Sequence, residues 1–257
     1  METLRGRVAL VTGGSRNLGA TLVECLAERG ARVAFTYHTH SEAAEALARG
    51  VRQGNGEAVA VGCGLTTQGE VARLAEQVTA ALGPVDVLIH NAGPFCSHRF
   101  IDLPEAAWDE VMNVNLKAAY LLAQAFGPSM VRRGWGRVVF LGAVSACNAE
   151  GAVYGLAKAG LPWLARALAL ELAPQVTVNV VAPGQIEESL AELEESDPGL
   201  AARKLAATPL GQFARRGLVA DLVLSLCSPG FDHTTGAVIP IDGGASIPRM
   251  WKTRSSP

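Results

Sequence analysis

A tyrosine and a lysine four positions apart are the first residues of this sequence that could do chemistry together. Tyr154 and Lys158 stand in the segment AVYGLAK, and in a helix they would lie one turn apart on the same face. A phenol has a pKa of about 10, and a neighbouring ammonium is expected to lower that pKa by stabilising the phenolate. The pair therefore predicts a general acid with a charged helper. The alternative is an incidental pair on a helix surface.

A second chemical signal is the glycine-rich segment TGGSRNLG, residues 12–19, which follows an apolar run and precedes a helical pattern. Glycines in such a turn let the backbone approach a pyrophosphate, which the following helix N-terminus attracts. This context predicts a dinucleotide site rather than a mere turn. The residues expected to contact the cofactor here are Gly13, Ser15, Arg16, Asn17, Leu18 and Gly19.

The choice between the two nicotinamide dinucleotides depends on the end of the next apolar run. A carboxylate there would bind the ribose hydroxyls of NAD and repel a 2′-phosphate. This run ends in Tyr37, His38 and Thr39 without an acid, and Arg16 could place a guanidinium in the same region. NADP(H) is therefore the expected cofactor. The alternative is that Arg16 faces solvent and His38 lies in a loop.

The elements that would position these residues follow a regular alternation of short apolar runs and longer segments of helical period. The runs are largely β-branched, as strands covered on both faces should be. This order predicts an α/β fold, a single-domain Rossmann fold with a doubly wound, seven-stranded parallel sheet and helices on both faces. The expected strands are 8–12, 32–37, 58–62, 85–90, 137–141, 176–182 and 237–241, and the expected helices are 18–29, 41–53, 67–82, 104–132, 152–173 and 217–227.

Three details complete this outline. Thr67 and Glu70 have the spacing of a capping box at the start of one helix. The polar segment 185–209 interrupts the alternation and is expected to form a substrate lid. One domain is expected over residues 1–257, with a loose tail at 248–257.

Composition limits the classes of partner. The 257 residues are 49% hydrophobic and 18% charged, and the net charge is −2, which gives no reason to expect nucleic acid as a partner. The five cysteines are widely spaced, so neither a disulfide framework nor a metal site is expected. The N-terminus does not resemble a signal peptide and no stretch is long enough to span a membrane. A soluble, cytoplasmic protein without a membrane partner is expected.

Together these motifs resemble those of the short-chain dehydrogenase/reductase family, and within it the NADPH-dependent ketoreductases of the 3-oxoacyl-carrier-protein type. The similarity spans the chain from Val8 to Gly244. It is carried by Thr12 to Gly19, by His90, Asn91, Ala92 and Gly93 at the N-N-A-G segment, by Asn115, by Tyr154 and Lys158, by Pro183-Gly184, and by Asp242 to Gly244.

The resemblance implies roles for further residues. Asn115 would order a water that relays protons to Lys158, and Lys158 would also hold the nicotinamide ribose. Other implied cofactor contacts are Gly64, Leu65, Asn91, Ala92, Gly93, Tyr154, Pro183, Gly184 and Ile186. Besides Asn17, which stands at the middle glycine of the turn, two positions depart from the family pattern. Gly64 replaces an aspartate that contacts adenine, so Leu65 backbone is expected to serve instead. Glu188 replaces a threonine that holds the carboxamide.

The fourth departure affects the substrate oxygen. Family members place a serine after the fifth strand, where this chain has Ala143, and the loop to Tyr154 is short. Our hypothesis is that Ser145 swings in and shares the carbonyl oxygen with Tyr154; otherwise a water or a polar group of the substrate fills the gap. Loss of one such donor costs roughly 10²- to 10³-fold in rate, which weakens catalysis without abolishing it.

The expected function is NADPH-dependent reduction of a carbonyl, in a ketone or a 3-oxoacyl group that could be carrier-bound. A second interpretation is a regulatory or scaffold protein with decayed chemistry, suggested by Ala143 and Glu188 but opposed by the joint presence of Asn115, Tyr154 and Lys158. A third is reduction of a C=N or C=C bond. Helices 104–132 and 152–173 commonly pack against symmetry mates in this family, so a homo-oligomer, in particular a tetramer, is expected.

Overall fold

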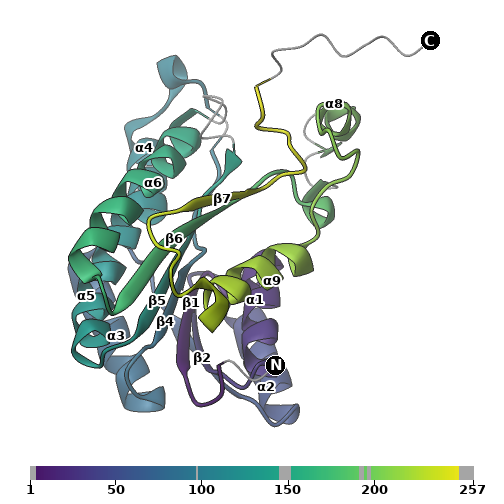
Figure 1. The fold of residues 1–257 in the computed structure, drawn as a ribbon. Helices are drawn as coiled ribbons and strands as arrows, with labels where there is room; N and C mark the ends of the chain where they lie inside the picture. The colour runs from purple at the N-terminus through teal and green to yellow at the C-terminus, as the bar shows by residue number, and fades with distance from the viewer. Residues whose placement is uncertain (1–3, 97, 145–151, 191–193, 196–197, 249–257) are drawn as a thin grey trace.

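A parallel sheet of seven strands forms the centre of the molecule (Figure 1), in the order β3-β2-β1-β4-β5-β6-β7. The computed structural model of the chain describes residues 4–96, 98–144, 152–190, 194–195 and 198–248. Every neighbouring pair of strands is parallel. The strands are β1 (Val8–Thr12), β2 (Arg32–Tyr37), β3 (Glu57–Gly62), β4 (Val87–His90), β5 (Gly136–Leu141), β6 (Val176–Pro183) and β7 (Val238–Ile241). The predicted doubly wound sheet is confirmed.

Helices cover both faces of the sheet, with α3, α5 and α6 on one side and α1, α2 and α9 on the other (Figure 1). Each face has its own apolar core. Along β4 the side chains alternate between them: Leu88 belongs to one core, and Val87 and Ile89 belong to the other. The strands read as continuous apolar runs because both faces are buried. The helices on these faces are α1 (Asn17–Glu28), α2 (Ser41–Gln53), α3 (Gln68–Leu82), α5 (Ala118–Arg132), α6 (Ala152–Leu172) and α9 (Arg216–Leu226).

Helix α3 begins with the capping box that the sequence predicts. The hydroxyl of Thr67 accepts the backbone N–H of Glu70 at 3.2 Å, and the carboxylate of Glu70 accepts the backbone N–H of Thr67 at 3.0 Å. Two donors that the first helical turn leaves unpaired are thereby satisfied.

The long helix predicted over 104–132 has a different internal structure. It consists of α4 (Glu105–Met112), a π-helical turn at Asn113–Lys117, and α5. In the π-turn the N–H of Ala118 bonds to the carbonyl of Asn113, five residues back. Turns of this kind are uncommon and often lie at functional sites. The chain keeps a helical path, so the periodicity that predicted one helix persists through the interruption.

The segment predicted as a lid is fastened to the start of α9. A 3₁₀ turn, Glu187–Ser189, opens it, and α8 (Leu200–Ala206) follows. Arg215 Nε lies 2.9 Å from a carboxylate oxygen of Glu187, and both carboxylate oxygens of Glu188 lie 3.2 Å from the backbone nitrogen of Arg216. The remaining short elements are the 3₁₀ turns Phe100–Asp102 and Pro229–Phe231. Residues 249–257 of the predicted tail lie outside the described residues.

Within the described residues, the helices are all too short or too polar to cross a membrane.

Candidate active site

A cleft of about 460 Å³ opens where β1, β2, β3 and β4 end. In parallel α/β sheets ligands bind beside these carboxyl ends. Thirteen predicted cofactor residues line the cleft together: Gly13, Ser15, Arg16, Asn17, Leu18, Gly19, Tyr37, His38, Gly64, Leu65, Asn91, Ala92 and Gly93. Segments more than seventy residues apart in the sequence are thus brought to one site, as the motifs predict.

The glycine turn is packed so closely on itself that position 19 requires glycine. A Cβ on Gly19 would lie 2.0 Å from the carbonyl oxygen of Gly13, so no larger residue fits. Asn17 takes a left-handed backbone conformation with φ of 52°, which asparagine tolerates better than most residues. From β4, the amide of Asn91 donates to the carbonyls of Thr12 at 3.2 Å and Gly13 at 3.0 Å. The glycine turn is therefore tied to the end of β4 through Asn91 and to β2 through the hydroxyl of Thr36, which accepts the N–H of Gly13.

Arg16 is the exposed N-cap residue of α1 and lines the same cleft as His38. The residues that follow β2 are His38, Thr39 and His40, which carry no carboxylate. A guanidinium and two imidazoles therefore line this end of the cleft.

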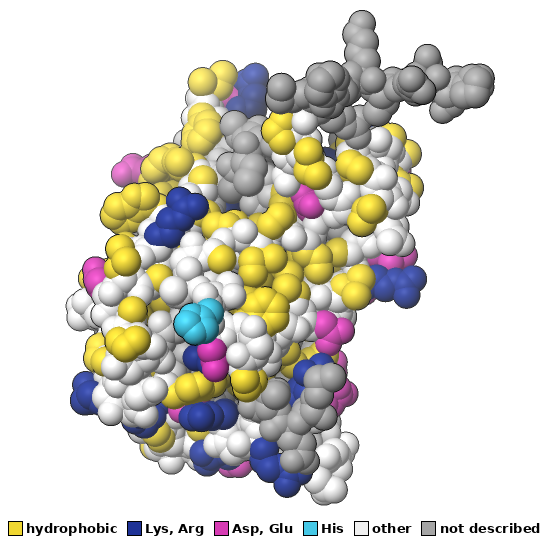
Figure 2. All heavy atoms as spheres, viewed as in Figure 1, with side chains coloured by type: hydrophobic (Ala, Val, Ile, Leu, Met, Phe, Trp, Pro, Cys, Tyr) yellow, Lys and Arg dark blue, Asp and Glu magenta, His cyan; other side chains and the backbone are white. Residues whose placement is uncertain are grey.

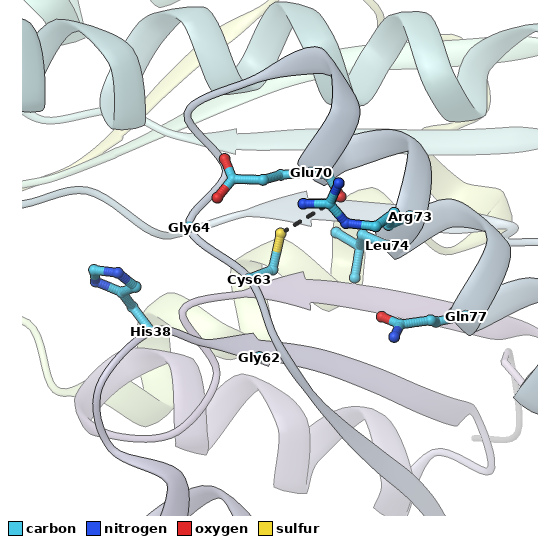
Figure 3. A pocket seen from close by; sticks show the side chains of 8 residues that line it. All are labelled: His38, Gly62, Cys63, Gly64, Glu70, Arg73, Leu74 and Gln77. Atoms are coloured by element: carbon cyan, nitrogen blue, oxygen red, sulfur yellow. Dashed lines mark hydrogen bonds between the residues drawn. The ribbon is translucent and has the colours of Figure 1, made fainter.

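Glu70 occupies the space that a side chain at residue 64 would take. A Cβ on Gly64 would lie 2.7 Å from Glu70 Oε1. Figure 3 shows the carboxylate reaching back from α3 beside Gly64, with His38 approaching from the end of β2. Partial burial acts to raise the pKa of Glu70, but hydrogen bonds from Thr66 and Thr67 outweigh it and lower the pKa below the ordinary value. The sequence identified Glu70 only as a helix cap and missed its place at the cleft.

Lys158 is buried beneath the end of β5. Its ammonium donates to the carbonyl of Leu141 at 2.8 Å, and only 3% of the residue is exposed. Burial lowers the pKa of Lys158 to about 8. The lysine thus holds the backbone at the last residue of β5, two residues before Ala143.

Tyr154 lies one turn before Lys158 on α6, as predicted, but its electrostatics differ from the expectation. Lys158 Nζ is 5.5 Å from the centre of the tyrosine ring, and its hydrogen bond goes to Leu141. Burial raises the pKa of Tyr154 to about 12. The predicted lowering of this pKa by the ammonium is therefore wrong for the structure, because desolvation exceeds the attraction of a charge at this distance.

Phe95 is a neighbour of the tyrosine that the sequence did not reveal. Its ring meets the Tyr154 ring edge to face, with 5.3 Å between the ring centres, and 63% of Phe95 is exposed. An apolar side chain so placed partly covers the phenol and adds to its burial. Position alone, two residues after the N-N-A-G segment, could have suggested it.

Asn115 is held in the π-turn with its amide turned toward the same region. Its Nδ2 donates to the carbonyls of Pro94 and Val111, each at 3.0 Å, while Oδ1 is buried with no hydrogen-bond partner among the described residues. A Cβ on Gly93 would lie 2.0 Å from Oδ1, which explains the glycine. The predicted Asn115 and Gly93 thus fit against each other.

The serine hypothesis concerns a loop of which only the first residues are described. Gly142 is buried, Ala143 and Val144 are partly buried, and Ser145 lies outside the described residues, which stop at 144 and resume at 152. The swing-in of Ser145 therefore stays a hypothesis.

The predicted cofactor residues Pro183, Gly184 and Ile186 stand at the end of β6 and just after it, and they are not among the residues that line the cleft. Gly184 packs against Asp242, to which a Cβ would approach within 2.8 Å, and its N–H bonds to Ile241. Ile186 pairs with Ala214. The carboxylate of Glu188 binds the N-terminus of α9, where a negative charge is favoured. In the structure Glu188 thus joins the segment predicted as a lid to the start of α9.

Across the described part of the chain, no group of three or more His, Cys, Asp or Glu side chains is arranged to hold a metal ion.

Comparisons with known proteins match this chain over nearly its whole length. A model of the family described as enoyl-(acyl carrier protein) reductase matches residues 13–246. The 3-oxoacyl-[acyl-carrier-protein] reductase of Aquifex aeolicus is 34% identical over 245 residues, covering 94% of this chain and 98% of that protein. A short-chain dehydrogenase/reductase from Serratia marcescens superposes with a TM-score of 0.87 at 31% identity, covering 95% of this chain and 99% of the other.

A second solved structure, a blue fluorescent protein from a metagenomic library in complex with NADPH, has a TM-score of 0.87 at 33% identity, with 95% of this chain and 99% of that chain covered. The likeness extends over nearly the whole sheet and its helices, in sequence as well as in fold. On these grounds the chain belongs to the short-chain dehydrogenase/reductase family of oxidoreductases.

Proposed function

We propose that this protein is an NADPH-dependent reductase of a carbonyl group, with Tyr154 as the proton donor. The observation that carries the proposal is the buried ammonium of Lys158, 5.5 Å from the centre of the Tyr154 ring, at the sheet edge where the cleft lined by the glycine turn also opens. This turn requires glycine at position 19, because a Cβ there would lie 2.0 Å from the carbonyl oxygen of Gly13. The 3-oxoacyl relatives support a ketone of the 3-oxoacyl type as substrate, free or carrier-bound.

The bound nicotinamide would supply the hydride, and the chain's own residues would handle the proton. Tyr154 donates its phenolic proton to the substrate oxygen as negative charge develops there. The raised pKa of Tyr154 keeps the phenol protonated between turnovers. The ammonium of Lys158, 5.5 Å from the centre of the Tyr154 ring, would stabilise the phenolate that forms when the proton leaves. Asn115 holds the neighbouring π-turn through its hydrogen bond to the carbonyl of Val111.

Glu70 and Gly64 suggest how the adenine is held. The ionised carboxylate of Glu70 beside Gly64 can accept a hydrogen bond from the exocyclic amine of adenine. A carboxylate from α3 would then take the place of the aspartate that residue 64 lacks.

The rival acceptor is a C=C bond, which the description of the matching family model names. A panel assay separates the two. Oxidation of NADPH by the purified protein is followed by absorbance with 3-oxoacyl thioesters, simple ketones, quinones, pterins and enoyl thioesters. We expect turnover with the 3-oxoacyl thioesters. Turnover with enoyl thioesters alone would assign the rival activity, and no turnover with any acceptor would favour a protein with decayed chemistry.

Cofactor choice gives the first prediction. The protein should bind NADPH at least about tenfold more tightly than NADH, and Arg16→Ala should remove most of that difference, because one charge-assisted hydrogen bond to a phosphate is worth about that factor. Dissociation constants from fluorescence titration measure this. Arg49→Ala, an exposed arginine on α2 away from the cleft, is the matched control. Tighter binding of NADH by the unaltered protein would refute the assignment.

Assembly gives the second prediction. Leu156, Trp163 and Leu170 recur every seven residues on α6, with exposed fractions of 46%, 74% and 84%. Figure 2 shows hydrophobic side chains gathered on the surface over α6 and β7. Large apolar surfaces of this kind mark interfaces. We expect a tetramer by light scattering and a smaller species for Trp163→Glu with Leu170→Glu. A monomeric unaltered protein at micromolar concentration would contradict this.

A further inference from the structure

His90, the last residue of β4, is a buried histidine whose protonation state follows from its contacts. Its exposed fraction is 0%, and its Nδ1 lies 2.9 Å from the hydroxyl oxygen of Thr12. That oxygen already accepts the backbone N–H groups of Asn91 at 3.1 Å and Ala92 at 3.0 Å. The one hydrogen of the hydroxyl must therefore go to Nδ1. His90 Nδ1 is an acceptor, so the ring carries its proton on Nε2.

The neutral ring is also what its surroundings favour. Burial, and then the positive charge of Lys158, lower the pKa of His90 to about 3, while the carbonyl groups of Asn115 and Val114 act in the opposite direction. Nε2 is buried and has no hydrogen-bond partner among the described residues. A buried donor thus lies near the backbone carbonyls of Asn115 and Val114 in the π-turn.

We propose that His90 is a positioning residue for the reaction: its Nε2–H holds the carbonyls of the π-turn, directly or through one water, and so fixes Asn115 beside Tyr154 and Lys158. The kinetic part of this inference rests on the proposed function. Thr12 has a defined part in the arrangement, because its hydroxyl selects the tautomer. The same hydroxyl ties together the ends of β1 and β4, where the cofactor cradle begins.

Two substitutions at His90 test the contact of Nδ1 and the contact of Nε2 separately. In His90→Asn the amide oxygen can still accept from Thr12, but the distal donor is gone. In His90→Gln a donor reaches the distal position. We expect kcat to fall by about tenfold in His90→Asn, to recover to within about threefold in His90→Gln, and NADPH affinity to stay near that of the unaltered protein in both. His233→Asn, an exposed histidine, is the control.

A measurement independent of activity accompanies the kinetics. Nitrogen NMR of the protein labelled at its five histidines should show one ring, absent from the His90→Asn spectrum, with its proton on Nε2 from about pH 5 to 9. Amide exchange across 113–118 should be faster in His90→Asn than in the unaltered protein.

The outcomes of these experiments are distinct. A proton on Nδ1, titration of that ring near neutral pH, or unchanged kcat and exchange in His90→Asn would overturn the inference. If the unaltered protein reduces no carbonyl, the proposed function fails, while the tautomer and the exchange rates still decide whether His90 holds the turn.

Discussion

Replacement of Tyr154 by phenylalanine is expected to reduce turnover by roughly 10³-fold or more and to leave NADPH affinity nearly intact. Removal of a positioned general acid costs roughly 10²- to 10⁴-fold, and the phenylalanine ring has no proton to donate. The ring itself stays in place, because its packing against Phe95 does not need the hydroxyl. Single-turnover kinetics with saturating NADPH measure the chemical step directly.

The matched control is Tyr120→Phe. Tyr120 lies on α5 and is 46% exposed, and its hydroxyl accepts a hydrogen bond from Gln124. This variant should keep the turnover of the unaltered protein. If Tyr154→Phe were as active as Tyr120→Phe, another group would have to supply the proton and Tyr154 would leave the mechanism.

Replacement of Lys158 by methionine is expected to abolish turnover, weaken NADPH binding, and change stability with a defined pH dependence. Burial lowers the pKa of Lys158 from 10.5 to about 8, which corresponds to a cost on the order of 3 kcal/mol for holding the charged form. Methionine removes this cost, which favours folding. It also leaves the carbonyl of Leu141 without its hydrogen bond, which offsets about 1–3 kcal/mol of that gain in stability. The pH dependence of the difference in unfolding free energy between the two proteins is therefore a cleaner test than the size of that difference at one pH.

The sign follows from proton linkage. Between about pH 8 and pH 10.5 the unfolded chain binds more protons at this lysine than the folded protein does, so the unaltered protein gains stability as pH rises through this window. The variant lacks that titration. Its stability relative to the unaltered protein should be greatest below about pH 8 and should decline toward pH 10.5, as measured by denaturant unfolding. A constant difference would mean that Lys158 is not buried in its charged form.

The fold was predictable because each of its signals is local. Fully buried strands such as β4 show as apolar runs, and the capping box of Thr67 and Glu70 shows as a spacing. The glycine turn and Asn91 were predictable in the same way, since their function depends on backbone geometry at fixed offsets. Tyr154 and Lys158 were predictable as a pair because four residues make one helical turn.

What could not be predicted depends on contacts between distant segments. The π-turn at Asn113–Lys117 leaves the helical period intact, so nothing in the pattern reveals it. The hydrogen bond of Lys158 joins α6 to β5, and without it the spacing alone suggested that the ammonium acts on the tyrosine. The carboxylate of Glu70 can lie in the cleft because residue 64 is a glycine, whose missing side chain leaves the space for it. The tautomer of His90 depends on the hydroxyl of Thr12, 78 residues away in the sequence.

The order of strands has a consequence for how the polypeptide is made. Strands β1, β2 and β3 are consecutive and neighbours in the sheet, so they can pair as soon as they leave the ribosome. The other edge of β1 must wait for β4, whose contact residue His90 is 78 residues after Thr12. Until β4 arrives, the nascent chain presents an open, apolar strand edge and an unfinished glycine turn. Neither aggregation protection nor dinucleotide affinity can therefore be complete before roughly the first third of the protein has been synthesised.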